Sequence, residues 1–293
     1  MRIGVKLPSS GRLAGQPPLK DAARHAEEAG FDSVWVSDHV VMLREVASPY
    51  PFSQDGRMYW DPEEPWYDAL ISMATAAAVT NRVEVGVAVL VVPMRNPLIL
   101  AKQLATLDAL SGGRVVLGAG AGWLAEEFEA LDSPFESRGE RFDEWIDILR
   151  DCWTGAPQNT DYKHYRIPDG ILCYPTPSRQ IPVLIGGMSK AAFRRAGHRG
   201  DGWLAIQHVE EINVAALRSI MENIGNTAHL AGRPMPERIA MRISGPIDDI
   251  ARQLGALVKV GVTDVVVDVD WLDRDSLSST AEMLRKARGD SQA

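Results

Sequence analysis

An acidic residue stands next to a histidine directly after a short apolar segment. Residues 33–37 read SVWVS, and Asp38 and His39 follow them. A carboxylate beside an imidazole can select the tautomer of the ring and raise its basicity, which suits general acid–base catalysis. The structural alternative is that Asp38 caps a turn and His39 packs beneath the next loop. We expect catalysis, with Asp38 orienting His39, because strand ends face the ligand in α/β enzymes.

Two glycine-containing segments could bring the backbone close to a ligand. Residues 118–123 read GAGAGW, but the spacing lacks the third glycine of a dinucleotide fingerprint. Residues 185–190 read IGGMSK and precede a predicted helix. Free N–H groups at a helix N-terminus, with small residues and Lys190 nearby, can bind an anion. The structural alternatives are a tight turn in the first segment and simple capping by Ser189 in the second.

The sequence offers little for metal-dependent or covalent catalysis. Its six histidines are scattered, with no HxH or HxxxH pair, so we expect no metal site. Asp264, Asp268 and Asp270 could hold a cation, but we interpret them as a solvated acidic edge. No GxSxG elbow or Walker loop occurs.

Composition narrows the class of partner. The chain has 293 residues and a formal net charge of −8, which argues against nucleic acid and favours a small-molecule substrate. Cys152 and Cys173 lack CxxC spacing, so we expect reduced, buried thiols. The longest apolar segment, 85–93, is too short to cross a membrane, and the N-terminus resembles no signal peptide. We therefore expect a cytoplasmic protein without membrane contact.

Short apolar segments alternate with helical patterns along the whole chain. The predicted strands are 3–7, 33–37, 83–92, 114–120, 183–186, 202–206, 239–243 and 262–267. The helical patterns between them include one opened by Pro65, one capped at Asn96 and one at 209–230, and the tail from Asp273 is helical. Eight strands, each followed by a helix, predict an α/β fold, a single (β/α)8 TIM barrel over residues 1–293. A doubly wound open sheet is the alternative.

Two insertions interrupt the alternation, at residues 40–65 after the second strand and at 154–180 before the fifth. Loops after barrel strands overhang the active face, so the first insertion should cover the ligand. It is rich in aromatic residues, including Tyr50 and Trp60. We expect either an aromatic lid over a flat substrate or a loop that packs its own small core.

Four segments together resemble the luciferase-like flavin and deazaflavin oxidoreductases. They are VWVSDH at 34–39, GVAVLVVPMRNP at 86–97, LAKQLATLDALSGGRVVLGAGAGW at 100–123 and IGGMSKAAFRRAGHRGDGW at 185–203. Several matched segments in the same order are more specific than any one motif. The branch that the chain most resembles uses coenzyme F420, a deazaflavin.

The resemblance implies roles for individual residues. Family members carry a non-prolyl cis peptide that supports the coenzyme ring, and the matching bond is Ala88–Val89. His39 matches a histidine near the reactive ring edge, with Asp38 as its neighbour. The remaining coenzyme contacts implied by the resemblance are Gly120 and Gly122 beside the ring, and Gly186, Gly187, Met188, Ser189 and Lys190 around the phosphate.

The resemblance implies an F420-dependent oxidoreductase that transfers a hydride between the deazaflavin and a small organic substrate, with His39 moving the proton. One departure concerns Trp123, which replaces a catalytic glutamate of the sugar-phosphate dehydrogenases and puts that substrate in doubt. The rival functions are a monooxygenase using reduced FMN and a non-catalytic flavin- or deazaflavin-binding protein. Dimers are common among such relatives, so a homodimer is compatible with the resemblance.

Overall fold

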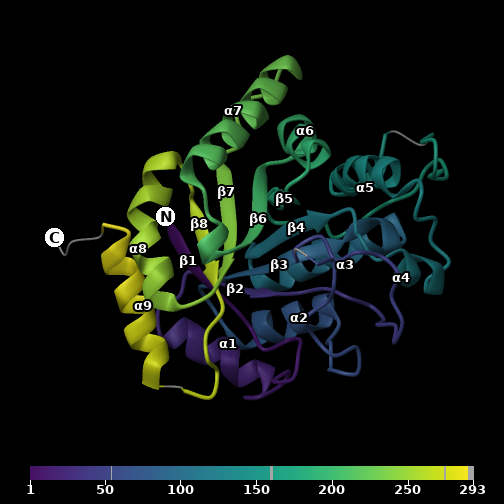
Figure 1. Cartoon of the computed structure of the whole chain (residues 1–293). Helices are drawn as coiled ribbons and strands as arrows, with labels where there is room; N and C mark the ends of the chain where they lie inside the picture. Colours follow the sequence, from purple (N-terminus) through teal and green to yellow (C-terminus); the bar gives the residue numbers. More distant parts are fainter. Residues whose placement is uncertain (54, 159–160, 274, 290–293) are drawn as a thin grey trace.

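The computed structural model describes residues 1–53, 55–158, 161–273 and 275–289. The parts of the predicted insertions and C-terminal tail at 54, 159–160, 274 and 290–293 lie outside the described residues. Within the described residues, eight parallel strands close into a barrel in chain order, and the first pairs with the last. They are β1 (Arg2–Lys6), β2 (Ser33–Val36), β3 (Glu84–Val91), β4 (Val115–Gly120), β5 (Val183–Gly186), β6 (Gly202–His208), β7 (Arg238–Ser244) and β8 (Asp264–Val267). The predicted (β/α)8 barrel is confirmed (Figure 1).

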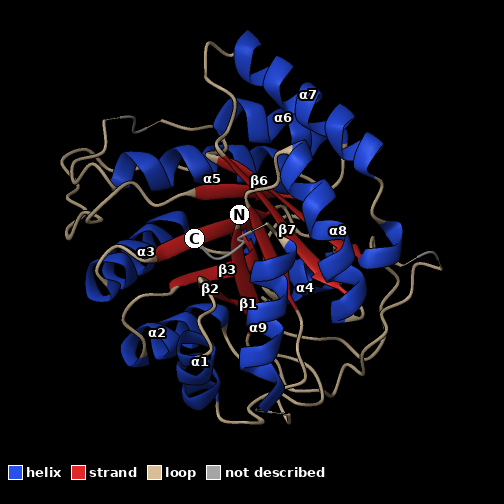
Figure 2. Cartoon of the chain, turned by 90° about the vertical axis from the view of Figure 1, so that its left-hand side faces the viewer, coloured by secondary structure: helices blue, strands red, loops and turns tan. Residues whose placement is uncertain are grey.

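Helices surround the strands (Figure 2). They are α1 (Leu19–Glu28), α2 (Ala69–Val79), α3 (Pro97–Ser111), α4 (Ala125–Ala130), α5 (Arg138–Cys152), α6 (Lys190–Arg199), α7 (Val214–Leu230), α8 (Ile247–Val260) and α9 (Asp275–Ala287), with 3-10 turns η1 (Val92–Met94) and η2 (Val209–Glu211). In the part of the chain that the structure describes, no helix has the length and apolar character needed to span a membrane.

Capping residues decide where the helices begin. Asn96 accepts hydrogen bonds from the N–H groups of Leu98 and Ile99, which confirms its predicted role as the cap of α3. The predicted start of α2 at Pro65 is wrong, because Asp68 caps the helix by accepting from Ile71 N. The predicted helix at 209–230 is split, since a second cap at Asn213 starts α7 after η2.

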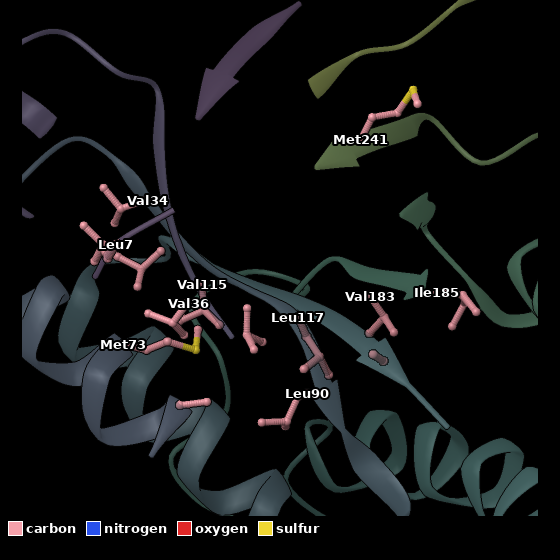
Figure 3. Close-up of a cluster of buried hydrophobic side chains, with 14 of the residues drawn as sticks. Leu7, Val34, Val36, Met73, Leu90, Val115, Leu117, Val183, Ile185 and Met241 are labelled. Atoms are coloured by element: carbon pink, nitrogen blue, oxygen red, sulfur yellow. The ribbon is translucent and has the colours of Figure 1, made fainter. Parts of the chain in front are cut away.

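Apolar side chains fill two layers. The larger layer lies between the strands and the helices, where outward-facing residues such as Val34, Val36 and Leu117 pack against α2 and α3 (Figure 3). The smaller layer fills the barrel interior around Trp35. Gly4 and Gly86 make room for that indole, because a Cβ atom at either position would collide with it.

Buried charges close the amino-terminal end of the barrel. Arg238 donates to Glu84 at 2.9 Å and to Asp264, and Arg2 Nε donates to Asp264 at 2.8 Å. Asp264 is 1% exposed, so its interpretation as part of a solvated edge is wrong. Burial alone would raise the pKa of Asp264, but Arg238 and Arg2 hold that pKa below its usual range.

The second insertion packs on the outside of the barrel. Ser178 N donates to Asp108 Oδ2 on α3 at 2.9 Å, and within the insertion Cys173 N donates to Gly155 O at 2.9 Å. Both cysteines are free, and they line one cavity of about 240 Å³. Cys152 is buried as predicted, but Cys173 is only half-buried. Burial and the neighbouring Cys173 raise the pKa of Cys152 to about 12.

Candidate active site at the carboxyl ends of the strands

His39 is held by a carboxylate from a distant part of the chain. Its Nδ1 lies 2.8 Å from Glu127 Oε2, and both side chains are buried. The other carboxylate oxygen, Oε1, accepts from Val40 N at 2.6 Å and from Val41 N at 3.3 Å. With a carboxylate oxygen against Nδ1, the tautomer that satisfies both groups has Nδ1 as the donor. The remaining ring nitrogen, Nε2, is then the acceptor available for proton transfer.

Asp38 does not orient His39, and that part of the prediction is wrong. Its two carboxylate oxygens accept from Arg95, at 2.7 and 2.8 Å, and from Val91 N at 2.9 Å. The pair is bidentate and buried, because the side chain of Asp38 is 0% exposed and that of Arg95 is 13% exposed. Burial raises the pKa of Asp38, and Arg95 opposes this shift. Asp38 therefore fixes the end of β3 rather than the imidazole.

Four aromatic side chains gather around His39. The centroid of its ring lies 4.7 Å from that of Trp66, 6.2 Å from Trp60 and 6.1 Å from Trp123. Tyr50 completes the group, 4.9 Å from Trp60 and 5.2 Å from Trp123. We call Tyr50, Trp60, Trp66 and Trp123 the aromatic cluster. The first insertion therefore packs a small core of its own and also covers the predicted catalytic histidine.

The helix α4 anchors the first insertion. Glu126 Oε1 accepts from Ala47 N at 2.7 Å and from Ser48 N at 3.0 Å, while Ser48 Oγ accepts from Ala125 N at 3.0 Å. Burial would raise the pKa of Glu126, but these hydrogen bonds lower it. Consecutive glutamates on one short helix thus hold the start of the insertion and the histidine beneath it.

The bulge in β3 carries the predicted cis peptide bond between Ala88 and Val89. The side chain of Val89 lies between two glycines of neighbouring strands. A Cβ atom at Gly120 would lie 2.5 Å from Val89 Cγ2, and one at Gly186 would lie 2.5 Å from Val89 Cγ1. Gly120 and Gly186 therefore make room for Val89, and Ala88 is buried in the interior layer.

The turn after β4 depends on Gly122. Its φ is +85°, and a Cβ atom there would lie 2.5 Å from Phe128 and 2.7 Å from Val91. The glycine therefore allows α4 and β3 to approach each other closely. This turn delivers Trp123 to the aromatic cluster and Glu127 to His39.

The loop after β5 leads into α6. Gly187 N donates to Leu204 O at 3.2 Å, and its carbonyl accepts from Trp203 Nε1 at 2.8 Å. Ser189 caps α6 by accepting from Ala192 N at 3.2 Å, as the structural alternative predicted. Met188 is half-buried, whereas Ser189 and Lys190 are exposed. The cap occupies the N–H group of Ala192, while the preceding N–H groups at the start of the helix have no intrahelical partner and can face an anion.

Among the described residues, no group of three or more histidine, cysteine or acidic side chains could hold a metal ion. The features described at this end of the barrel include a buried imidazole–carboxylate pair, the aromatic cluster and the bulge of β3.

Comparison with known proteins identifies the family of the chain. Residues 1–248 match the luciferase-like monooxygenase family. The chain belongs to this family. The uncharacterized protein Rv0940c of Mycobacterium tuberculosis is 34% identical to this luciferase-like chain over 248 residues, 84% of this chain and 82% of the relative. The F420-dependent glucose-6-phosphate dehydrogenase of Amycolatopsis mediterranei is 33% identical over 208 residues, 70% of this chain and 57% of that enzyme.

Solved structures share the fold of this luciferase-like chain. An F420-dependent secondary alcohol dehydrogenase, in complex with an F420–acetone adduct, superimposes with a TM-score of 0.76 at 18% identity and covers 99% of both chains. The long-chain alkane monooxygenase LadA gives a TM-score of 0.74 at 14% identity, over 100% of this chain and 92% of that one.

Sequence reasoning missed Glu127 and Arg95. Glu127 lies 88 positions from His39, and adjacency along the chain favoured Asp38 instead. The available signal was the place of Glu127 in the first turn of α4, shortly after β4, since the segments that follow all barrel strands meet at one end. Arg95 follows β3 in the same way.

Proposed function

We propose that this luciferase-like chain is a coenzyme F420-dependent oxidoreductase acting on a small organic substrate at the carboxyl end of the barrel. The observation that carries the proposal is the buried His39–Glu127 pair. It provides one acceptor nitrogen with a fixed tautomer beneath a cluster of aromatic rings. Such an arrangement suits proton transfer to or from a substrate held away from water.

The residues at this end fit a flat, anionic coenzyme. Val89 presents one aliphatic side chain between Gly120 and Gly186, which would support a planar ring. The first turn of α6 would hold the phosphate through its free N–H groups, with the exposed Lys190 adding positive charge. In this proposal Gly187, Met188 and Ser189 shape the loop, and Gly122 positions the neighbouring turn.

Each protein group has a separate task in the reaction. When bound, the deazaflavin supplies the two-electron acceptor or donor at ring carbon five. His39 accepts the substrate proton at Nε2 during oxidation and returns it during reduction. Glu127 keeps the other proton on Nδ1 and stabilises the charged ring. Asp38 holds Val91 and Arg95, so it preserves the shape of the bulge that carries Val89.

Relatives favour F420 as the coenzyme. Two relatives named F420-dependent glucose-6-phosphate dehydrogenase, from Amycolatopsis mediterranei and Kineococcus radiotolerans, are 33% and 29% identical over the aligned residues. Trp123 occupies the position where the resemblance places a glutamate in those enzymes. Our proposal therefore takes the coenzyme, and not the sugar phosphate, from these relatives.

Coenzyme titration tests the proposal. We expect the purified protein to bind F420 in the micromolar range or more tightly and FMN much more weakly, as measured by fluorescence and equilibrium dialysis. The reverse preference would favour the second candidate, a monooxygenase that uses reduced FMN, which the family description and the likeness to the alkane monooxygenase support. Oxygen uptake with reduced FMN would then be the assay. Binding of neither coenzyme would contradict both candidates.

A non-catalytic coenzyme-binding protein is the least favoured candidate, because it would not need the buried His39–Glu127 pair. A single domain over residues 1–293, a cytoplasmic location and a homodimer stay predictions. Sedimentation of the purified protein measures the last of these.

A further inference from the structure

Two cations lie together at the end of the barrel that carries His39. Lys6 is the last residue of β1, Arg242 lies near the end of β7, and Asp268 directly follows β8. Arg242 donates to both oxygens of Asp268, at 3.1 and 3.2 Å. Lys6 Nζ donates to Ser10 Oγ at 3.0 Å. We call Lys6, Arg242 and Asp268 the cationic group, since its net charge is one positive unit.

The alternation of side chains along the strands directs this group inward. Ala240 and Val266 belong to the layer inside the barrel. Arg242 and Asp268 each follow one of them by two positions, so they lie on the same face of their strands. Lys6 stands two positions after Gly4, whose Cα faces the indole of Trp35 inside the barrel. The cationic group therefore lies inside the barrel, between the interior apolar layer and the carboxyl ends of the strands.

The cationic group has unused hydrogen-bonding capacity. Arg242 Nε is buried and has no partner among the described residues, although a buried donor without an acceptor is costly. Ser10 takes only one of the three ammonium hydrogens that Lys6 can offer. Burial and the neighbouring Arg242 together lower the pKa of Lys6 to about 8, against the opposing effect of Asp268. An additional anion would relieve the repulsion between the two cations.

Two connections link the cationic group to the aromatic cluster. Ser10, the partner of Lys6, pairs with Trp66 in an antiparallel bridge, and the ring of Trp66 contacts His39. Tyr50 lies close enough to Arg242 for that charge to act on its hydroxyl, and Tyr50 packs on Trp60. The cationic group and His39 therefore border one region.

The aromatic cluster adds further donors. The indole N–H groups of Trp60 and Trp66 are buried without a partner among the residues that the structure describes. Together with Arg242 Nε and the Lys6 ammonium, they form a set of hydrogen-bond donors. A bound molecule that satisfies this set must supply acceptor atoms, and its anionic part belongs beside the two cations.

We propose that Lys6 and Arg242 bind the carboxylate of the substrate, so that the enzyme acts on a carboxylic acid with a flat, apolar body. The body would lie among Tyr50, Trp60, Trp66 and Trp123, with the reacting carbon toward His39. That the bound acid is a substrate rests on the proposed oxidoreductase function. A carboxylate matches the single net positive charge, whereas a phosphate dianion would leave one negative charge uncompensated.

Binding of benzoate by the whole protein tests the proposal, with benzamide as the uncharged control of the same shape. Titration calorimetry and tryptophan fluorescence would be recorded at neutral pH, on the free protein and on protein saturated with F420. We expect benzoate to bind both forms, with benzamide about tenfold or more weaker. Inorganic phosphate should bind more weakly than benzoate.

Variants locate the bound carboxylate. Arg242→Gln and Lys6→Met should each weaken benzoate binding about tenfold or more and leave the affinity for F420 unchanged, which also reports correct folding. The exposed residues Arg218 and Lys259 supply the controls Arg218→Gln and Lys259→Met, which should change neither affinity.

Three outcomes, all measured on the unmodified protein, would overturn the proposal. The first two are benzamide binding as tightly as benzoate and phosphate binding more tightly than benzoate. The third is displacement of benzoate by F420, which would assign the two cations to the acidic tail of the coenzyme. If benzoate binds as expected but F420 does not, the proposed coenzyme fails while the carboxylate site stands.

Discussion

Glu127 Oε2 lies 2.8 Å from Nδ1 of His39, although 88 positions separate the two residues along the chain. The carboxylate also accepts from the backbone N–H groups that directly follow the histidine, so it fixes both the ring and the chain around it. A second group that orients a catalytic histidine commonly contributes to rate rather than to ligand affinity. Two variants separate these effects.

His39→Ala should lower kcat about 100-fold or more while the affinity for F420 changes little, because the imidazole moves a proton and does not hold the coenzyme. Equal losses of turnover and coenzyme affinity in His39→Ala would contradict its role.

Glu127→Gln should lower kcat about 10- to 100-fold and shift the pH profile of kcat, since the neutral amide no longer stabilises a charged ring. Glu129→Gln, at an exposed position of α4, is the matched control.

Asp38→Asn should destabilise the protein by about 3 kcal/mol, because it leaves the guanidinium of Arg95 buried without its anion. Urea unfolding measures this loss. The exposed ion pair of Arg44 and Glu63, at 3.0 Å, provides the control, and Glu63→Gln should have little effect. A similar change in the free energy of unfolding for both variants would show that the buried ion pair stabilises the protein no more than the exposed one.

Gly120→Ala should lower both stability and F420 affinity, because the new methyl group would displace the side chain of Val89. We expect a loss of about 1–3 kcal/mol in the free energy of unfolding. Gly255→Ala is a useful contrast, since nothing lies near that position on α8. It should stabilise the protein by about 0.5–1 kcal/mol and leave the coenzyme affinity unchanged.

The free energy of unfolding should fall in acid partly through Asp264. The folded chain holds the pKa of this carboxyl below its usual value of about 4. Its stabilising effect is therefore complete above that value and is lost as the pH falls through the lower pKa of the folded state. Asp264→Asn should cost about 3 kcal/mol at pH 7 and flatten the acid side of the stability curve. An unchanged acid slope in urea titrations would contradict this assignment.

Cys152 should be nearly inert toward thiol reagents in the folded protein at pH 8. Burial and the adjacent Cys173 raise its pKa to about 12, so almost no thiolate is present. Reaction with a chromogenic disulfide should report one fast thiol, from the half-buried Cys173, and a second only after unfolding. Cys173→Ser identifies the fast thiol, since that variant should lose the early phase.

Periodicity and capping residues predicted the barrel well. The strand at 183–186 matches β5 at both ends, and Asn96 caps α3 as expected, because both signals are local. The start of α2 was misplaced because Pro65 is also compatible with the insertion, where the backbone of Trp66 pairs with Ser10. That pairing joins distant parts of the chain, so no local pattern could predict it.

The candidate site was predicted less completely than the fold. His39 lies at the end of β2 as expected, but adjacency in sequence gave it the wrong partner, Asp38. Three-dimensional closure of the barrel brings Glu127 to the imidazole and Arg95 to Asp38. The glycines at 120 and 186 each accommodate Val89, a role that the sequence did not suggest, and their contact with a ligand stays a prediction. Each of these contacts joins residues that are distant in sequence and meet only at the carboxyl end of the closed barrel, so no local pattern could predict them.

The paired glutamates of α4 divide the site into two modules for protein engineering. Glu127 holds both His39 and the backbone at 40–41, and Glu126 holds the chain again at 47–48. The segment beyond these anchors, which carries most of the aromatic rings, can be shortened, lengthened or exchanged while both anchors stay in place. A redesign of substrate range would therefore vary the loop between residue 48 and Trp66 and keep Trp66 itself, whose ring contacts His39.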